Sequence, residues 1–293
     1  MQTIPFTKMH GCGNDYVYID QFDTPFIRDP AALAVRLSER HRGIGSDGLI
    51  LVCPPRDSAN HGRMRMFNAD GSEGKMCGNG IRCVGKFLFD HGYATAPVLR
   101  IETAAGLRVV RLRIHDGICD GASVDMGVAS HTGAEIPVNA CDTQHIPVIV
   151  DGQTILLCAV SMGNPHAVLF TDVSPETLPI TEIAGEIAAY RTDHGTPLFP
   201  EGVNVEFIRV HDAQTLEMRV YERGSGETMA CGTGACAAVC AAIRNGYSAF
   251  DTPVTVHLRG GDVQVTVQPN WQVTLTGPAE TAFVGTFQSG DEL

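Results

Sequence analysis

Two cysteines, Cys77 and Cys231, lie in matched surroundings that suit acid–base chemistry. Residues 73–80 read Glu-Gly-Lys-Met-Cys-Gly-Asn-Gly, and residues 227–234 read Glu-Thr-Met-Ala-Cys-Gly-Thr-Gly. A thiol directly before a helix lies beside N–H groups and a helix dipole that favour negative charge, which lowers its pKa from about 8.5. The glycines that follow let the backbone approach a bound anion. Each motif therefore offers a base together with a cradle for a carboxylate.

A second repeat indicates that the whole chain is duplicated. Residues 13–15 read Gly-Asn-Asp and residues 163–166 read Gly-Asn-Pro-His, 150 positions later, while the two cysteine motifs are 154 positions apart. Two copies of one half-fold explain both repeats. A pseudo-twofold arrangement would present one thiol to each side of a ligand. Such a pair suits inversion of a stereocentre, because one group removes a proton from one face while the other supplies a proton to the opposite face.

The segments that must position these motifs are helices and strands. Apolar residues recur at helical spacing over 81–88, and the run stops at residues 91–92, His-Gly. The stretch 235–243 is apolar all round, so it must be buried on every face. β-like alternation marks the segments 110–114, 254–258 and 263–267. We therefore expect two α/β halves, one to about residue 125 and one to about residue 275, each with strands around one internal helix.

Composition excludes several classes of function. The chain has 293 residues and a formal net charge of −12, with Lys and Arg scattered singly, so a nucleic-acid partner is not expected. Its longest apolar run is far shorter than the roughly 20 residues that span a bilayer, and residues 1–10 carry no export signal, so we expect no membrane and a cytoplasmic location. The ten cysteines include no Cys-x-x-Cys pair, which favours free thiols over disulfides or a metal site.

The motifs, taken together, resemble those of the diaminopimelate epimerase family, pyridoxal-independent isomerases of lysine and peptidoglycan precursor biosynthesis. The blocks that carry the resemblance are 8–15, 67–73, 76–83, 163–166, 202–204 and 221–236. They run in order, so the likeness covers most of the chain.

The resemblance implies an enzyme that interconverts LL-2,6-diaminopimelate and the meso form, with Cys77 and Cys231 as the acid–base pair and no cofactor. It implies an α/β (α+β) fold of two pseudo-symmetric domains, each a mixed β-barrel wrapped around a central helix. The domains expected are 1–125 with a C-terminal return of 276–293, and 126–275. The resemblance also implies a homodimer.

The resemblance also assigns the remaining site residues. The substrate contacts it implies are Asn14, Asn68, Asn164, Asn204, Glu222 and Arg223, with Gly78, Asn79, Gly232 and Thr233 at the two helix starts. His166 and Glu222 match positions that adjust the two thiols. From the residue types alone, asparagine in a Gly-Asn pair is more often a turn residue, whereas an arginine fork suits a substrate carboxylate.

Two other functions compete with this interpretation. A proline or hydroxyproline racemase also uses two cysteines as acid and base. Its first motif, however, usually has histidine after Cys-Gly, where this chain has Asn79. A cyclic imino acid also lacks the second charged end that the asparagines and Arg223 would serve. A non-enzymatic, thiol-rich zinc or redox protein would instead need clustered Cys-x-x-Cys pairs, which the sequence lacks.

Overall fold

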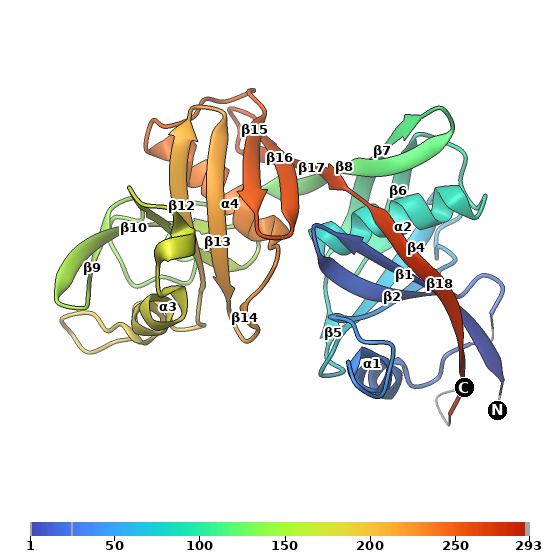
Figure 1. The fold of residues 1–293 in the computed structure, drawn as a ribbon. Coiled ribbons are helices and arrows are strands. Elements are labelled where there is room, and N and C mark those ends of the chain that lie inside the picture. Colours follow the sequence, from blue (N-terminus) through green and yellow to red (C-terminus); the bar gives the residue numbers. More distant parts are fainter. Residues whose placement is uncertain (1, 25, 291–293) are drawn as a thin grey trace. The chain divides into compact units, whose positions relative to one another are not determined.

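The computed structural model describes residues 2–24 and 26–290, and these form two compact units (Figure 1). The first unit contains the described residues up to Asp125 together with those from Thr276 onward, and the second is Met126–Leu275. The chain leaves the first unit within strand β8 (Ile118–Val128) and returns within strand β17 (Gln272–Pro278). The C-terminal strand therefore belongs to the same unit as the N-terminus.

The first unit is a mixed sheet with two helices. Its further elements are β1 (Thr3–Gly11), β2 (Asn14–Asp20), α1 (Pro30–Ser38), β3 (Gly48–Cys53), β4 (Gly62–Asn68), β5 (Glu73–Gly74), α2 (Gly78–Asp90), β6 (Val98–Thr103), β7 (Gly106–His115) and β18 (Glu280–Gln288). Strand β1 is antiparallel to both β18 and β2, β2 is parallel to β3, and β3 is antiparallel to β4. Strand β4 is antiparallel to β5 and parallel to β6, and β6, β7 and β8 are antiparallel neighbours.

The second unit repeats this plan. Its elements are β9 (Ile146–Val150), β10 (Gln153–Ser161), β11 (Pro165–Phe170), η1 (Pro175–Thr177), α3 (Ile180–Ala189), β12 (Asn204–Asp212), β13 (Thr215–Glu222), β14 (Gly226–Glu227), α4 (Gly232–Arg244), β15 (Val254–Leu258) and β16 (Gly261–Val267). Strand β10 is antiparallel to β9 and β11, β11 is parallel to β12, and β12 is antiparallel to β13. Strand β13 is antiparallel to β14 and parallel to β15, and β15 is antiparallel to β16.

The same order of parallel and antiparallel pairings identifies matching elements in the two units. Strands β1 to β7 correspond to β10 to β16, helix α1 corresponds to α3, and helix α2 corresponds to α4. This confirms the sheet-dominated α+β fold that the sequence predicts. It also means that residues at matching positions of the paired strands and helices can be compared between the two units.

Each cysteine-led helix is the centre of its unit (Figure 1). Helix α2 contacts β1, β2, β3, β4 and β7, and helix α4 contacts β10, β11, β12 and β16. The predicted stop after α2 is confirmed, since the N–H of His91 donates to the carbonyl of Phe87 and Gly92 has a φ of +73°. Such a left-handed residue ends a helix without steric cost when it is glycine. Both helices are 13 residues long, and each begins at the glycine directly after its cysteine.

Helix α4 fits its surroundings because its side chains are small. Its buried residues are Gly232, Gly234, Ala235, Cys236, Ala237, Ala238, Val239, Cys240, Ala241 and Ala242. The expectation of burial on every face is confirmed. A helix lined by alanine allows strands to pack closely, so any added volume must displace its neighbours. Among the described residues, no helix is long and apolar enough to cross a membrane.

We predict that Ala238→Leu lowers the free energy of unfolding of the second unit by about 1–3 kcal/mol, because overpacking a close-packed core forces its neighbours apart. Ala238 is fully buried. Urea denaturation followed by the fluorescence of Trp271, the chain's one tryptophan, reports on this unit. Leu156→Ala is the control, since Leu156 is 53% exposed and its loss should change stability by less than about 0.5 kcal/mol. Equal stabilities for Ala238→Leu and the wild type would contradict the close packing around α4.

Candidate active site

Cys77 and Cys231 are the N-cap residues of the two central helices. Each cysteine has extended backbone, and its sulfur accepts a hydrogen bond from the N–H three residues later. The distances are 3.3 Å from Gly80 N to Cys77 Sγ and 3.4 Å from Gly234 N to Cys231 Sγ. Each sulfur therefore lies at the positive end of a buried helix.

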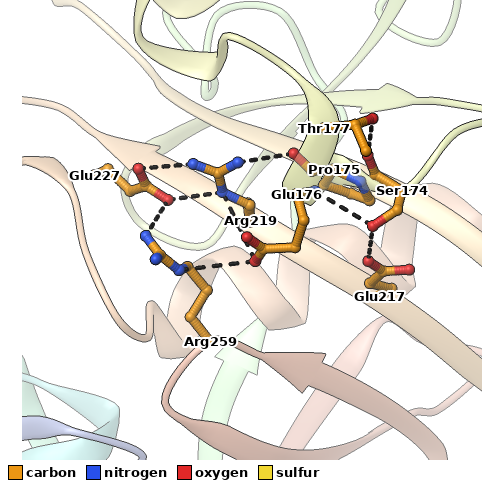
Figure 2. A network of polar contacts seen from close by, with 8 residues as sticks. All are labelled: Ser174, Pro175, Glu176, Thr177, Glu217, Arg219, Glu227 and Arg259. Carbon is orange, nitrogen blue, oxygen red and sulfur yellow. Dashed lines mark hydrogen bonds and ion pairs between the residues drawn. The ribbon is translucent and has the colours of Figure 1, made fainter.

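An arginine–glutamate clamp fastens the segment before each cysteine. In the first unit Arg65 on β4 donates twice to Glu73 on β5, at 2.9 and 3.2 Å. In the second unit Arg219 on β13 donates to Glu227 on β14 at 2.7 and 2.9 Å, and Arg259 adds a contact of 2.8 Å (Figure 2). These are the glutamates that the sequence repeats four residues before each cysteine. Two parallel hydrogen bonds give such a pair a fixed geometry, so both clamps hold the approach to the helix.

Amide side chains surround Cys77. The sulfur donates to Asn14 Oδ1 at 3.3 Å, and Asn79 Nδ2 donates to the same oxygen at 3.4 Å. The Asn14 amide donates in turn to Asp47 Oδ2 at 2.9 Å. Arg82, fully buried within α2, donates to Asn79 Oδ1 at 3.0 Å. A carboxylate and a guanidinium thus fix both amides, and the Asn14 oxygen faces the thiol.

A different group of polar side chains surrounds Cys231. Its sulfur lies 3.5 Å from Thr233 Oγ1, which accepts from Asn164 Nδ2 at 3.4 Å. Asn164 Oδ1 is 3.1 Å from His166 Nε2, and His166 Nδ1 is 2.6 Å from Glu206 Oε1. A chain of polar contacts therefore links a buried carboxylate on β12 to the thiol at the start of α4.

The electrostatics around Cys231 oppose the direction expected from the helix dipole. Burial raises the pKa of the Cys231 thiol well above its ordinary value, and the negative charges of Glu222 and Glu206 raise it further. Burial also raises the pKa of Glu222, although a hydrogen bond from Thr228 works in the other direction. The expectation of a lowered pKa is wrong at this cysteine, because removal from water and two carboxylates outweigh the contribution of the helix.

The other residues expected to contact substrate have structural partners. Asn68 ends β4 and donates to Ser72 Oγ at 2.9 Å. Asn204, buried at the start of β12, accepts from the backbone N–H of Arg223 and donates to the carbonyl of Pro165, both at 2.9 Å. The Arg223 side chain is exposed and donates to a backbone carbonyl. Gly78 and Gly232 are the first residues of the two helices.

Three charged residues of the site were not predicted from the sequence. Asp47 and Arg82 orient the amides near Cys77, and Glu206 lies behind His166. Arg82 and Glu206 interrupt otherwise apolar, buried runs, and a charge in such a run is the signal that could have identified them. By contrast, Cys83 is buried within α2, and this burial raises the pKa of its thiol to about 11, which is typical of a cysteine that packs in a core. Among the described residues, no three His, Cys, Asp or Glu side chains are grouped so that they could hold a metal ion.

The family profile and the similar sequences point to the same family. The diaminopimelate epimerase family profile matches residues 6–132 and 158–282. The chain is 45% identical to the diaminopimelate epimerase of Acetivibrio thermocellus, with 96% of this chain and 97% of the relative covered. It is 42% identical to that of Geobacillus kaustophilus, with 98% of this chain and 97% of the relative covered. The enzyme of Desulfovibrio desulfuricans is 45% identical, with 96% and 97% covered.

Solved structures with lower identity share the fold. A hydroxyproline epimerase from Agrobacterium vitis, with bound trans-4-hydroxy-L-proline, aligns with a TM-score of 0.69 at 18% identity and covers 97% of this chain and 92% of its own. A PhzF-family phenazine biosynthesis protein from Bacillus anthracis aligns with a TM-score of 0.70 at 16% identity. The alignment covers 99% of this chain and 100% of that protein. At these identities the likeness concerns the fold alone.

We predict that Glu222→Gln lowers the pKa of Cys231, because it removes a negative charge that disfavours the thiolate. A downward shift of one unit corresponds to about tenfold more thiolate at a fixed alkaline pH. The pH dependence of alkylation at Cys231, read by mass spectrometry with exposed Cys141 as internal reference, measures the shift. Glu186→Gln, an exposed change on α3, should leave the profile unchanged. An unchanged or upward profile in Glu222→Gln would contradict the electrostatic account.

Proposed function

This chain belongs to the diaminopimelate epimerase family, and we propose that it inverts one α-carbon of diaminopimelate by proton transfers at Cys77 and Cys231. The reaction interconverts LL-2,6-diaminopimelate and meso-diaminopimelate, which places the enzyme in lysine and peptidoglycan precursor biosynthesis. The observation that carries the proposal is the matched placement of the two thiols, each the N-cap of the central helix of its unit. The halves of the enzyme are then residues 1–125 with 276–293, and residues 126–275.

The proton transfers balance without a net change in the enzyme's charge. One cysteine, as thiolate, takes the α-proton, and the C–H electron pair stays on carbon. The other cysteine, as thiol, gives its proton to the opposite face of that carbon. The pair ends with exchanged protonation states, ready for the substrate of opposite handedness. This reaction requires both sulfurs to reach one α-carbon from opposite sides.

The helix starts stabilise the negative charge that develops. An amino-acid α-hydrogen is far less acidic than a thiol, so the site must stabilise carbanion character next to the carboxylate. The positive ends of α2 and α4 favour a bound anion, and Gly78 and Gly232 let the carboxylate approach the backbone. The two thiols supply both proton transfers, so the proposed mechanism uses no cofactor and no metal.

The remaining proposed contacts recognise the substrate. Asn14, Asn79 and Thr233 lie beside the reacting thiols, and each offers polar atoms to an amino acid. Asn68, Asn164, Asn204, Glu222 and Arg223 complete the proposed substrate-binding set. Arg223, as an exposed guanidinium, suits a carboxylate of the substrate. His166 and Glu222 modulate the thiol of Cys231, in accord with the proximity of Glu222 and the contacts of His166.

A proline or hydroxyproline racemase remains the nearest alternative. A hydroxyproline epimerase shares the fold, but the relatives at 42–45% identity are diaminopimelate epimerases. Parallel assays of the purified chain with LL-diaminopimelate and with L-proline separate the two functions. Inversion of proline without inversion of diaminopimelate would overturn the proposed substrate.

We propose a cytoplasmic location because none of the ten cysteines, all of which lie in the described residues, forms a disulfide, as is usual in a reducing compartment. We also propose a homodimer. Strand β18 carries two exposed apolar side chains, Phe283 at 49% and Val284 at 72% exposure. Apolar groups gathered on one exposed strand are typical of an interface, and a second copy of this chain is the partner we propose.

We predict that Cys77→Ala and Cys231→Ala each lower kcat for epimerisation by at least about 10²-fold, because each removes one of the two proton-transfer groups. The thiol that remains should still exchange the α-hydrogen of one stereoisomer with deuterated solvent. NMR follows both reactions. Cys141→Ala is the matched control, since Cys141 is exposed and lies outside the proposed site. Near-normal epimerisation by either single variant would exclude a two-thiol mechanism.

We predict that Val284→Asp converts the proposed dimer to a monomer, because a carboxylate would be desolvated in an apolar interface. Sedimentation velocity gives the mass in solution. Val173→Asp introduces the same charge at a residue of the second unit that is 51% exposed, and it should remain dimeric. A monomeric wild type, or a Val284→Asp variant that stays dimeric, would exclude β18 as the interface.

A further inference from the structure

Glu206 is a fully buried carboxylate with one hydrogen-bond partner in its vicinity. It lies on β12, is 0% exposed, and its Oε1 is 2.6 Å from Nδ1 of His166, which is also 0% exposed. Its Oε2 has no hydrogen-bond partner among the described residues. An ionised carboxylate that is removed from water is strongly destabilised unless a hydrogen-bonded opposite charge compensates it. His166 is the group in position to do so.

His166 lies between two side chains that each turn an oxygen toward its ring. Nδ1 faces the Glu206 carboxylate, and Nε2 faces the Asn164 amide oxygen at 3.1 Å. An ionised Glu206 and the Asn164 oxygen both accept hydrogen bonds, and a ring that donates from both of its nitrogens, as an imidazolium does, satisfies them together. The Asn164 oxygen is thereby held toward His166, and its NH₂ group is turned toward Thr233 Oγ1 at 3.4 Å, beside Cys231.

The first unit has no such carboxylate at the matching position. A Cβ built on Gly234 would lie 2.8 Å from Glu206 Oε1, and a Cβ built on Gly80 would lie 2.8 Å from Ile50 Cδ1. Ile50 on β3 is therefore the counterpart of Glu206 on β12. In the first unit the Asn14 amide has the opposite orientation, because its NH₂ donates to Asp47.

We propose that Glu206 is a positioning residue for the epimerase reaction. It holds His166 as an imidazolium, and His166 orients Asn164 so that an amide donor faces the Cys231 end of the site. Asn14 presents an acceptor to Cys77 instead. The two halves thus share one scaffold but turn opposite ends of the matching asparagine amides toward the starts of their helices. This role rests on the proposed function, since it assigns Glu206 to the support of Cys231 in that reaction.

The test is ¹⁵N NMR of the full chain labelled at histidine, combined with kinetics. We expect both ring nitrogens of His166 to be protonated in the wild type at pH 8, with the resonances assigned by their loss in His166→Gln. In Glu206→Gln the side chain keeps its size and an acceptor but loses its charge. We expect His166 then to carry a single ring proton, and kcat to fall at least about tenfold while KM changes less than about twofold.

Glu186→Gln is the matched control, because Glu186 is an exposed carboxylate of the same unit on α3. It should leave both the His166 spectrum and kcat unchanged. A wild-type His166 with one protonated nitrogen would overturn the proposal, and so would a Glu206→Gln variant with unaltered spectrum and kcat. If Glu206→Gln fails to fold, the wild-type spectrum still decides whether the ion pair exists. Failure of the wild type to epimerise diaminopimelate would instead count against the proposed function, and the spectrum would report on the ion pair independently.

Discussion

A sulfur that caps a buried helix is the constraint on which the rest of this structure depends. The hydrogen bonds from Gly80 and Gly234 to the cysteine sulfurs fix each thiol at the first turn of its helix. Each helix is in turn held by the strands that surround it and by a clamp on the segment before the cysteine. The position of a single sulfur atom in each unit is therefore determined by packing throughout that unit. Chemistry that needs two thiols in defined places requires this rigidity.

The two units share a fold, but the polar groups around their cysteines differ. Matching strands and helices place Asn14 and Asn164 at equivalent sites, yet the charged groups behind them differ. Asp47 accepts from the NH₂ group of Asn14, whereas His166 lies against the oxygen of Asn164. Since an asparagine presents either an oxygen or an NH₂ group, the partner behind it decides which one the site receives. A symmetric fold can thus support two thiols that begin the reaction in different protonation states.

Local patterns in the sequence predicted much of this arrangement. The duplication, the two helices and their starts at the cysteine motifs follow from spacing along the chain, and the structure confirms the helices. The direction of the Cys231 pKa could not be predicted, because it depends on burial by distant strands. Glu206 and His166 are 40 positions apart and meet across two parallel strands. Such a contact leaves no trace in local periodicity, apart from a charge within an apolar run.

A crystal structure of the chain with bound diaminopimelate would show whether both thiols reach the same carbon atom. We expect one α-carbon of the ligand to lie about 3.5 Å from the sulfurs of both Cys77 and Cys231, on opposite faces, as proton transfer requires. The α-carboxylate should lie at the starts of α2 and α4. A bound ligand with only one of the two sulfurs within reach of its α-carbon would contradict the two-thiol mechanism.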